Sequence, residues 1–152
     1  MEFRKNSHSV YMLTYHVVIV TKYRKPVIDD VIGDFMKSYA SRLVEAHGGS
    51  VISAETDRDH MHILMELPPQ KAPADVVKVV KTQLSKECHL RYSAEIQKHL
   101  YGDRTPLWSS SYFIATTGTT VMSKVKEYIN SQRTDDHKRK YEKTGRYSKK
   151  KR

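Results

Sequence analysis

His60 and His62 stand two residues apart in the stretch DHMHIL, among residues that are otherwise mostly apolar. Because side chains alternate between the two faces of a strand, both histidines would point to one side while Met61 and Ile63 point to the other. Side chains at this spacing lie roughly 6 to 7 Å apart, which lets two imidazoles bind one metal ion. Alternatively, the histidines only cover an open sheet face. A metal site requires a third ligand.

The segment TTVMSKVKEYINSQ offers a candidate for that ligand. Val121, Val125, Tyr128 and Gln132 are spaced four, three and four residues apart, which places Tyr128 and Gln132 one helical turn from each other. A metal held by the histidine pair and Gln132 would withdraw charge from a phosphate oxygen, and the hydroxyl of Tyr128 would attack the phosphorus. The alternative is that Tyr128 lies at the core edge and that Gln132 lies at a frayed helix end.

Hydrophobic periodicity and turn residues predict the elements that must position these side chains. Their order is strand, helix, strand, strand, helix, strand, helix. The strands are expected at residues 10–21, 51–54, 60–67 and 108–117, and the helices from about Asp29 to Gly48, after Pro73, and from about Thr119 to Gln132. Residues 91–106 are expected to form a shorter helix or an irregular connection. This order suits an antiparallel sheet with helices packed against it, an α+β fold of the ferredoxin-like or RRM-like kind.

The apolar residues on the two strand faces and on the first helix define a candidate core. Met61, Ile63, Met65 and Leu67 form the expected core face of their strand. The first helix carries its apolar stripe at helical spacing, at Ile32, Phe35, Tyr39, Leu43 and Ala46. Trp108 and Tyr112 are expected to be core residues, although both could stack on bases.

The length of 152 residues suits one domain, expected over residues 1–136, and the formal net charge is +10. Most of this charge is C-terminal, because residues 133–152 hold ten basic and three acidic residues, a net of +7. Residues 137–152 are expected to form a disordered basic tail. Such a tail would bind a polyanion such as DNA, or would simply be a solvated terminus.

The composition also limits the compartment. No apolar run approaches the ~20 residues that span a bilayer, so no membrane association is expected. The N-terminal residues lack the pattern of a secretory signal, and Cys88 is the only cysteine. Both features fit a reducing cytoplasm, and Cys88 itself is expected to be buried or inert.

The stretch TKYRKP places Lys22, Tyr23, Arg24 and Lys25 at the end of the first predicted strand. A base could stack on Tyr23 while the cations contact phosphates, or the stretch could be a solvated turn. Both interpretations remain open. His16, on the same strand, is expected to be a packed or hydrogen-bonded histidine rather than a further metal ligand.

Four segments together resemble a known family. They are YHVVIVTKYRKPVI at residues 15–28, DHMHILMELPP at 59–69, LWSSSYFIATTG at 107–118 and YINSQ at 128–132. In this order and spacing they resemble the single-tyrosine transposases of bacterial and archaeal insertion sequences, a branch of the HUH endonucleases. A histidine pair alone is weak evidence, but the four segments combined are specific and cover nearly the whole predicted domain.

The resemblance implies the HUH endonuclease fold, with His60 and His62 as the histidine pair, Gln132 as the third ligand and Tyr128 as the nucleophile. It implies cleavage of single-stranded DNA at the ends of the element, through a 5′-phosphotyrosine bond that a 3′-hydroxyl later attacks. It also implies a divalent metal, Mg²⁺ or Mn²⁺, whereas the ligand types alone favour zinc or manganese.

The resemblance further implies a homodimer whose active site is shared between subunits, and DNA hairpins near the ends of the element as binding targets. Two other functions are considered. One is a transposase-derived nucleic-acid-binding regulatory module without strand transfer. The other is a replication initiator or relaxase of the same superfamily, whose domain usually sits in a longer chain.

Overall fold

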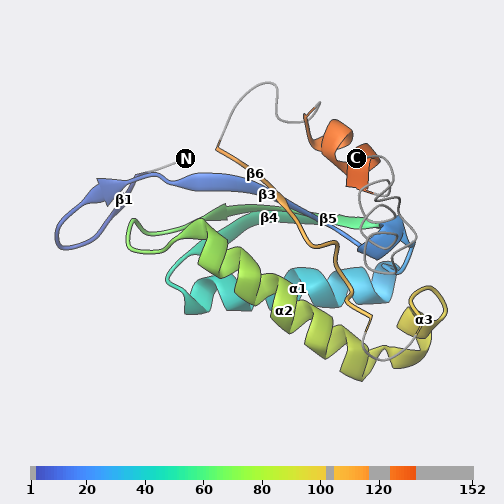
Figure 1. Cartoon of the computed structure of the whole chain (residues 1–152). Helices are drawn as coiled ribbons and strands as arrows, with labels where there is room; N and C mark the ends of the chain where they lie inside the picture. The colour runs from blue at the N-terminus through green and yellow to red at the C-terminus, as the bar shows by residue number, and fades with distance from the viewer. Residues whose placement is uncertain (1–2, 102–104, 117–123, 133–152) are drawn as a thin grey trace, which may run out of the picture.

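The computed structural model describes residues 3–101, 105–116 and 124–132. Its main sheet is antiparallel and has four strands in the order β4-β5-β3-β6. The strands are β3 Thr14–Val20, β4 Ser50–Asp57, β5 His60–Glu66 and β6 Phe113–Ala115. Helices α1 (Asp30–Ala46) and α2 (Pro73–Arg91) cover one face, and a helix over residues 124–132 lies on the other (Figure 1). The predicted α+β fold is confirmed, and the four strands of this sheet and the helices follow one another along the chain in the predicted order.

The predicted first strand is wrong in one respect, because residues 10–21 form two strands. β2 (Val10–Tyr11) pairs with β1 (Arg4–Lys5) in a separate hairpin, and only β3 joins the main sheet. The side chain of Asn6 accepts hydrogen bonds from the backbone N–H groups of His8 and Ser9 and closes the hairpin turn. Periodicity marks extended residues but does not show which strand they pair with, so the hairpin was not foreseen.

The predicted last strand is also shorter than expected. Only β6 pairs with β3, while Trp108 forms an isolated bridge with Thr21. Between them, the carbonyl oxygens of Ser109 and Ser111 accept hydrogen bonds from the Lys81 ammonium at 2.8 and 3.1 Å. These carbonyls are therefore directed at α2 instead of the sheet, which explains why the ladder is interrupted.

Helix α1 begins as predicted and buries a slightly different stripe. The Asp29 carboxylate accepts a hydrogen bond from the Ile32 N–H at 2.8 Å, and Gly48 follows the helix with φ of 84°. The fully buried hydrophobic residues are Ile32, Met36, Ala40 and Val44, whereas the predicted Phe35, Tyr39 and Leu43 pack at the edge of the core and Ala46 is exposed. The helix is thus rotated by about one residue relative to the predicted stripe.

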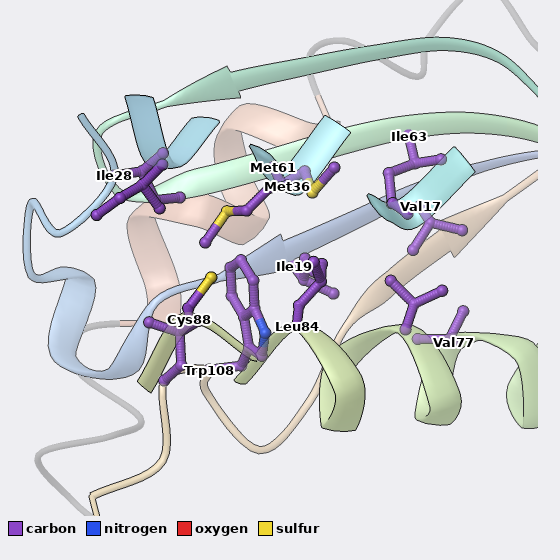
Figure 2. Close-up of a cluster of buried hydrophobic side chains, with 14 of the residues drawn as sticks. Val17, Ile19, Ile28, Met36, Met61, Ile63, Val77, Leu84, Cys88 and Trp108 are labelled. Atoms are coloured by element: carbon purple, nitrogen blue, oxygen red, sulfur yellow. The ribbon is translucent and has the colours of Figure 1, made fainter. Parts of the chain in front are cut away.

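The main core lies between the sheet and helices α1 and α2 (Figure 2). Met61, Ile63, Met65 and Leu67 are all buried there, as their alternation along β5 predicts. Trp108 joins the same cluster, and burial raises the pKa of the neighbouring Cys88 thiol to about 12. The segment expected to be a short helix or connection contains α3 (Ser93–Gln97). Within the described ranges, no helix is both long and apolar enough to cross a membrane.

Candidate active site

The histidine pair and the C-terminal helix lie on the same face of the sheet. His60 and His62 pair directly with Val20 and Val18 of β3, and cross-strand partners point to the same side. The helix over residues 124–132 packs Val125 and Ile129 against these two valines, in a small cluster separate from the main core. The structure therefore brings the two predicted parts of the site onto one surface, opposite α1 and α2 (Figure 1).

His60 is oriented by the residue that precedes it. Its Nδ1 lies 2.9 Å from a carboxylate oxygen of Asp59, and the other carboxylate oxygen accepts a hydrogen bond from Nε of Arg24 at 3.0 Å. These two contacts, that of His60 foremost, hold the pKa of Asp59 below its ordinary value, so the carboxylate is charged and can only accept. The Nδ1 of His60 therefore carries the proton, and its Nε2 is the nitrogen suited to bind a metal.

His62 contacts the third histidine on this face. Its Nε2 lies 3.1 Å from Nδ1 of His16, and the two ring centroids are 5.3 Å apart. Burial lowers the pKa of His62, and nearby positive charge on His16 and His60 lowers it further. The imidazole is therefore neutral near pH 7, the form that binds metals. The expectation of a hydrogen-bonded His16 is confirmed.

Tyr128 and Gln132 meet at Ser111, just before β6. The Ser111 Oγ lies 2.8 Å from the Tyr128 hydroxyl and donates to the Gln132 Oε1 at 3.2 Å. A serine hydroxyl has one proton, so while Ser111 donates to the amide oxygen, the phenol must donate to Ser111. Gln132 is only 5% exposed, and Tyr128 also contacts the ring of Phe113, with centroids 5.9 Å apart. The Tyr128 phenol and the Gln132 amide are therefore neighbours, as predicted.

The donor set fits a divalent metal, although the ligand roles stay predictions. Where the structure describes the chain, no three His, Cys, Asp or Glu side chains are grouped so as to hold a metal ion. The histidine pair would thus need a ligand of another type, and the amide oxygen of Gln132 belongs to the helix that lies over this face. Two imidazoles and an amide oxygen suit a divalent ion that completes its shell with water or phosphate oxygens.

The TKYRKP stretch lies beside the histidine end of the sheet. It contains the short 3₁₀ helix η1 (Lys22–Arg24), and the backbone N–H of the preceding Thr21 donates to the Asp59 carbonyl at 2.9 Å. The Lys22 ammonium lies 5.4 Å from the centroid of the Tyr23 ring. Arg24 also reaches the C-terminal helix, where it donates to Oδ1 of Asn130 at 3.3 Å. The DNA contacts predicted for Lys22, Tyr23, Arg24 and Lys25 stay predictions.

Sequence analysis missed three contributors to this surface: Ser111, Asp59 and the contacts of Arg24. Asp59 could have been found, because an acidic residue directly before a metal-binding histidine is well placed to orient it. Ser111 gave no signal, since it is one of three consecutive serines and its contacts are 17 and 21 residues distant in the chain. The predicted basic tail lies outside the described residues.

Comparison with known proteins identifies the family. The family model described as "Transposase IS200 like" matches residues 9–132, which include the histidine pair, Tyr128 and Gln132. The chain belongs to the IS200-like transposase family. One relative is the ISDra2 transposase TnpA of Deinococcus radiodurans, 31% identical over 132 residues, which are 87% of this chain and 92% of the relative. The transposase of element IS200 from Salmonella typhimurium is 25% identical over 130 residues, 86% of this chain and 83% of the relative.

Solved structures of transposases share the fold. A transposase from Deinococcus radiodurans R1 superposes with a TM-score of 0.77 and 28% identity, covering 85% of this chain and 97% of that one. A REP-associated tyrosine transposase, bound to a REP hairpin, gives a TM-score of 0.50 at 12% identity, covering 93% of this chain and 76% of that one. The first likeness supports the family, and the second shows the fold alone.

Proposed function

We propose that this IS200-like transposase cleaves and rejoins single-stranded DNA at the ends of an insertion sequence, with Tyr128 as the nucleophile. The observation that carries the proposal is the position of Tyr128 and Gln132 on one turn of a helix that packs over the histidine face of the sheet. A hydroxyl, an amide and two imidazoles on one surface are the groups that metal-assisted attack on a phosphodiester requires.

In the first step, the Tyr128 oxygen bonds to the phosphorus and the bond from phosphorus to the 3′-oxygen breaks. The products are a 5′-phosphotyrosine and a free 3′-hydroxyl. Tyr128 releases its proton to the solvent as it attacks, and the hydrogen bond from the phenol to Ser111 orients the hydroxyl group. The leaving 3′-oxygen takes up a proton from the solvent.

In the second step, a 3′-hydroxyl of another strand attacks the same phosphorus. The attacking hydroxyl releases its proton to the solvent, the bond from phosphorus to the tyrosine oxygen breaks, and Tyr128 takes up a proton from the solvent. The number of phosphoester bonds is unchanged over the two steps, so strands are exchanged without ATP. The reaction would take place in the cytoplasm, and two cuts per event favour a homodimer.

The metal would be held by His60, His62 and Gln132, with Mg²⁺ or Mn²⁺ as the proposed ion. When bound, the ion supplies charge that stabilises the phosphorane-like transition state. The chain's own contribution is orientation, since Asp59 fixes the His60 ring and the neutral His62 leaves a lone pair for binding.

Hairpin DNA is the proposed target of recognition. The REP-associated relative with the same fold is bound to a REP hairpin. This chain is strongly basic, with 27 lysine and arginine residues against 17 acidic ones, so it would bind phosphates through charge as well as shape.

The test is a covalent-adduct assay with single-stranded oligonucleotides that span the ends of the element, in the presence of Mn²⁺. The wild-type chain should form a protein-DNA adduct that resists denaturation. Tyr128→Phe should form none while still binding the hairpin oligonucleotide. Tyr101→Phe is the matched control, because it makes the same change at a highly exposed tyrosine.

An adduct formed at full rate by Tyr128→Phe would refute the assignment of the nucleophile. The alternative function, a nucleic-acid-binding regulatory module, predicts tight DNA binding with no adduct from any variant and no dependence on divalent metal. The buried amide of Gln132 and the oriented His60 favour the enzyme, because a module that only binds DNA has no need for them.

A further inference from the structure

The backbone around Arg24 has an uncommon conformation. Tyr23 and Arg24 have φ of 58° and 54°, and they are the two non-glycine residues with positive φ in the part of the chain that the structure describes. Side chains disfavour this left-handed region, so two consecutive residues remain there only where neighbouring contacts hold them. Such strain is concentrated at functional sites, and it directs attention to what these residues do.

The contacts that hold the backbone at Tyr23 and Arg24 come from the turn between β4 and β5 and from the segment before β6. The Thr21 side chain is fully buried, and its Oγ1 lies 2.8 Å from the Lys25 carbonyl oxygen and 3.1 Å from that of Asp59. The Lys22 N–H donates to the Leu107 carbonyl at 2.9 Å. The backbone of this turn is therefore fixed beside His60, and this fixes the position from which the Arg24 side chain extends.

At that place one guanidinium joins two elements that are far apart in the sequence. Its Nε donates to Asp59, whose other oxygen contacts Nδ1 of His60, and its Nη1 donates to Oδ1 of Asn130. Asn130 lies on the C-terminal helix, two residues after Tyr128 and two before Gln132. Arginine suits this task because its planar group presents several donors in a fixed geometry.

We propose that Arg24 is a positioning residue that couples the seating of the tyrosine helix to the orientation of His60. The consequence for the reaction rests on the proposed function, but the coupling itself is a property of the metal-free chain. When the helix is seated, Asn130 and Asp59 both hold the guanidinium, and Asp59 in turn fixes the His60 ring with Nε2 available. Loss of Arg24 leaves Asp59 without its second partner and removes one contact that retains the helix.

The first test measures orientation without metal or DNA. In the full-length metal-free protein, the ring ¹⁵N chemical shifts of His60 should show one dominant tautomer with the proton on Nδ1. Arg24→Gln should move these shifts toward a mixture of tautomers. Amide hydrogen exchange in residues 124–132 should also become faster in Arg24→Gln and in Asn130→Ala, since each variant removes the contact between the turn and the helix.

The second test measures affinity for Mn²⁺ by calorimetry. Groups that orient a metal-binding histidine typically contribute 10- to 100-fold to affinity, so Arg24→Gln and Asp59→Ala should weaken binding by about tenfold or more. Asn130→Ala should weaken binding to a smaller extent, because it loosens the helix that carries Gln132 while the link from Arg24 to Asp59 and His60 remains. Arg58→Gln is the matched control, since it removes the same charge from an exposed position on the neighbouring turn.

The sign of the change separates coupling from simple electrostatics. Removal of a positive charge near a cation site should strengthen metal binding, so weaker binding in Arg24→Gln, with no loss in Arg58→Gln, requires an orienting role. Arg24→Lys, which keeps the charge and the turn but not the planar group, should show an intermediate loss. It serves as the second variant if Arg24→Gln does not fold.

Unchanged His60 shifts, helix exchange and Mn²⁺ affinity in Arg24→Gln would overturn the proposal. If that variant instead lost only affinity for a single-stranded oligonucleotide, Arg24 would be a DNA contact and not a positioning residue. A wild-type chain that forms no DNA adduct would refute the proposed function, but the tautomer and exchange measurements would still decide whether Arg24 couples the two elements.

Discussion

Ser111 offers the sharpest test of how the tyrosine helix is held. Its hydroxyl bridges the Tyr128 phenol at 2.8 Å and the Gln132 amide oxygen at 3.2 Å. Ser111→Ala removes both hydrogen bonds and changes the side chain by one oxygen atom. Because Gln132 is almost fully buried, its amide oxygen would lose a partner that water does not easily replace.

The magnitude follows from these two contacts. A net contribution of about 1 kcal/mol for each hydrogen bond gives about 2 kcal/mol of lost docking free energy. Since 1.4 kcal/mol corresponds to a factor of ten, local opening of the helix should become about 25 times more frequent. The apolar contacts of Val125 and Ile129 remain, so the helix should still dock.

Amide hydrogen exchange, followed by mass spectrometry on peptides from residues 124–132, measures this opening directly. The main sheet should exchange at the wild-type rate, because Ser111 lies outside the main core. Ser110→Ala is the control, as it changes an exposed serine next in the chain. Exchange within threefold of wild type in Ser111→Ala would show that the bridge does not retain the helix.

Two further predictions concern titration. Burial, together with nearby positive charge, lowers the pKa of His62 below the ordinary histidine value of 6.5. The folded chain therefore binds fewer protons than the unfolded chain around this pH. The free energy of unfolding of the metal-free protein should consequently fall as the pH is lowered through 6.5. Urea titrations from pH 8 to 5 should show this slope, weaker in His62→Gln but retained in His8→Gln. Burial also raises the pKa of Cys88 from 9.0 to about 12, which makes the thiolate fraction at neutral pH about 1,000 times smaller. Iodoacetamide should therefore label this thiol in the denatured protein but not in the native protein. Equal labelling rates in the two states would contradict the burial of Cys88.

Much of the fold could be predicted because its elements follow local patterns. Alternation along β5 separated the core residues from the histidines, and Asp29 and Pro73 marked two helix starts. The hairpin of β1 and β2 and the late start of the last strand were missed for a common reason. Both features depend on the hydrogen-bond partners of backbone groups, which are those of β1 for residues 10–11 and the Lys81 ammonium for residues 109–111.

In the candidate site, too, local spacing indicated some residues and could not indicate others. Spacing along one strand and one helix indicated the histidine pair and the couple of Tyr128 and Gln132. The residues that orient them were not visible, because the contact of Arg24 with Asn130 spans 106 positions in the chain. Residues that orient the groups of a site are close to them in space, and a single sequence does not show which distant residues come close.

The sheet separates two very unequal sets of buried side chains. Among the residues that the structure describes, twenty-one form the cluster beneath the sheet, and four form the cluster above it, namely Val18, Val20, Val125 and Ile129. Resistance to heat therefore resides mainly on one side of the strands and the proposed chemistry on the other. A laboratory selection for thermal tolerance and a selection for a new DNA target should accumulate their substitutions on opposite sides of the same four strands, with little interference between them.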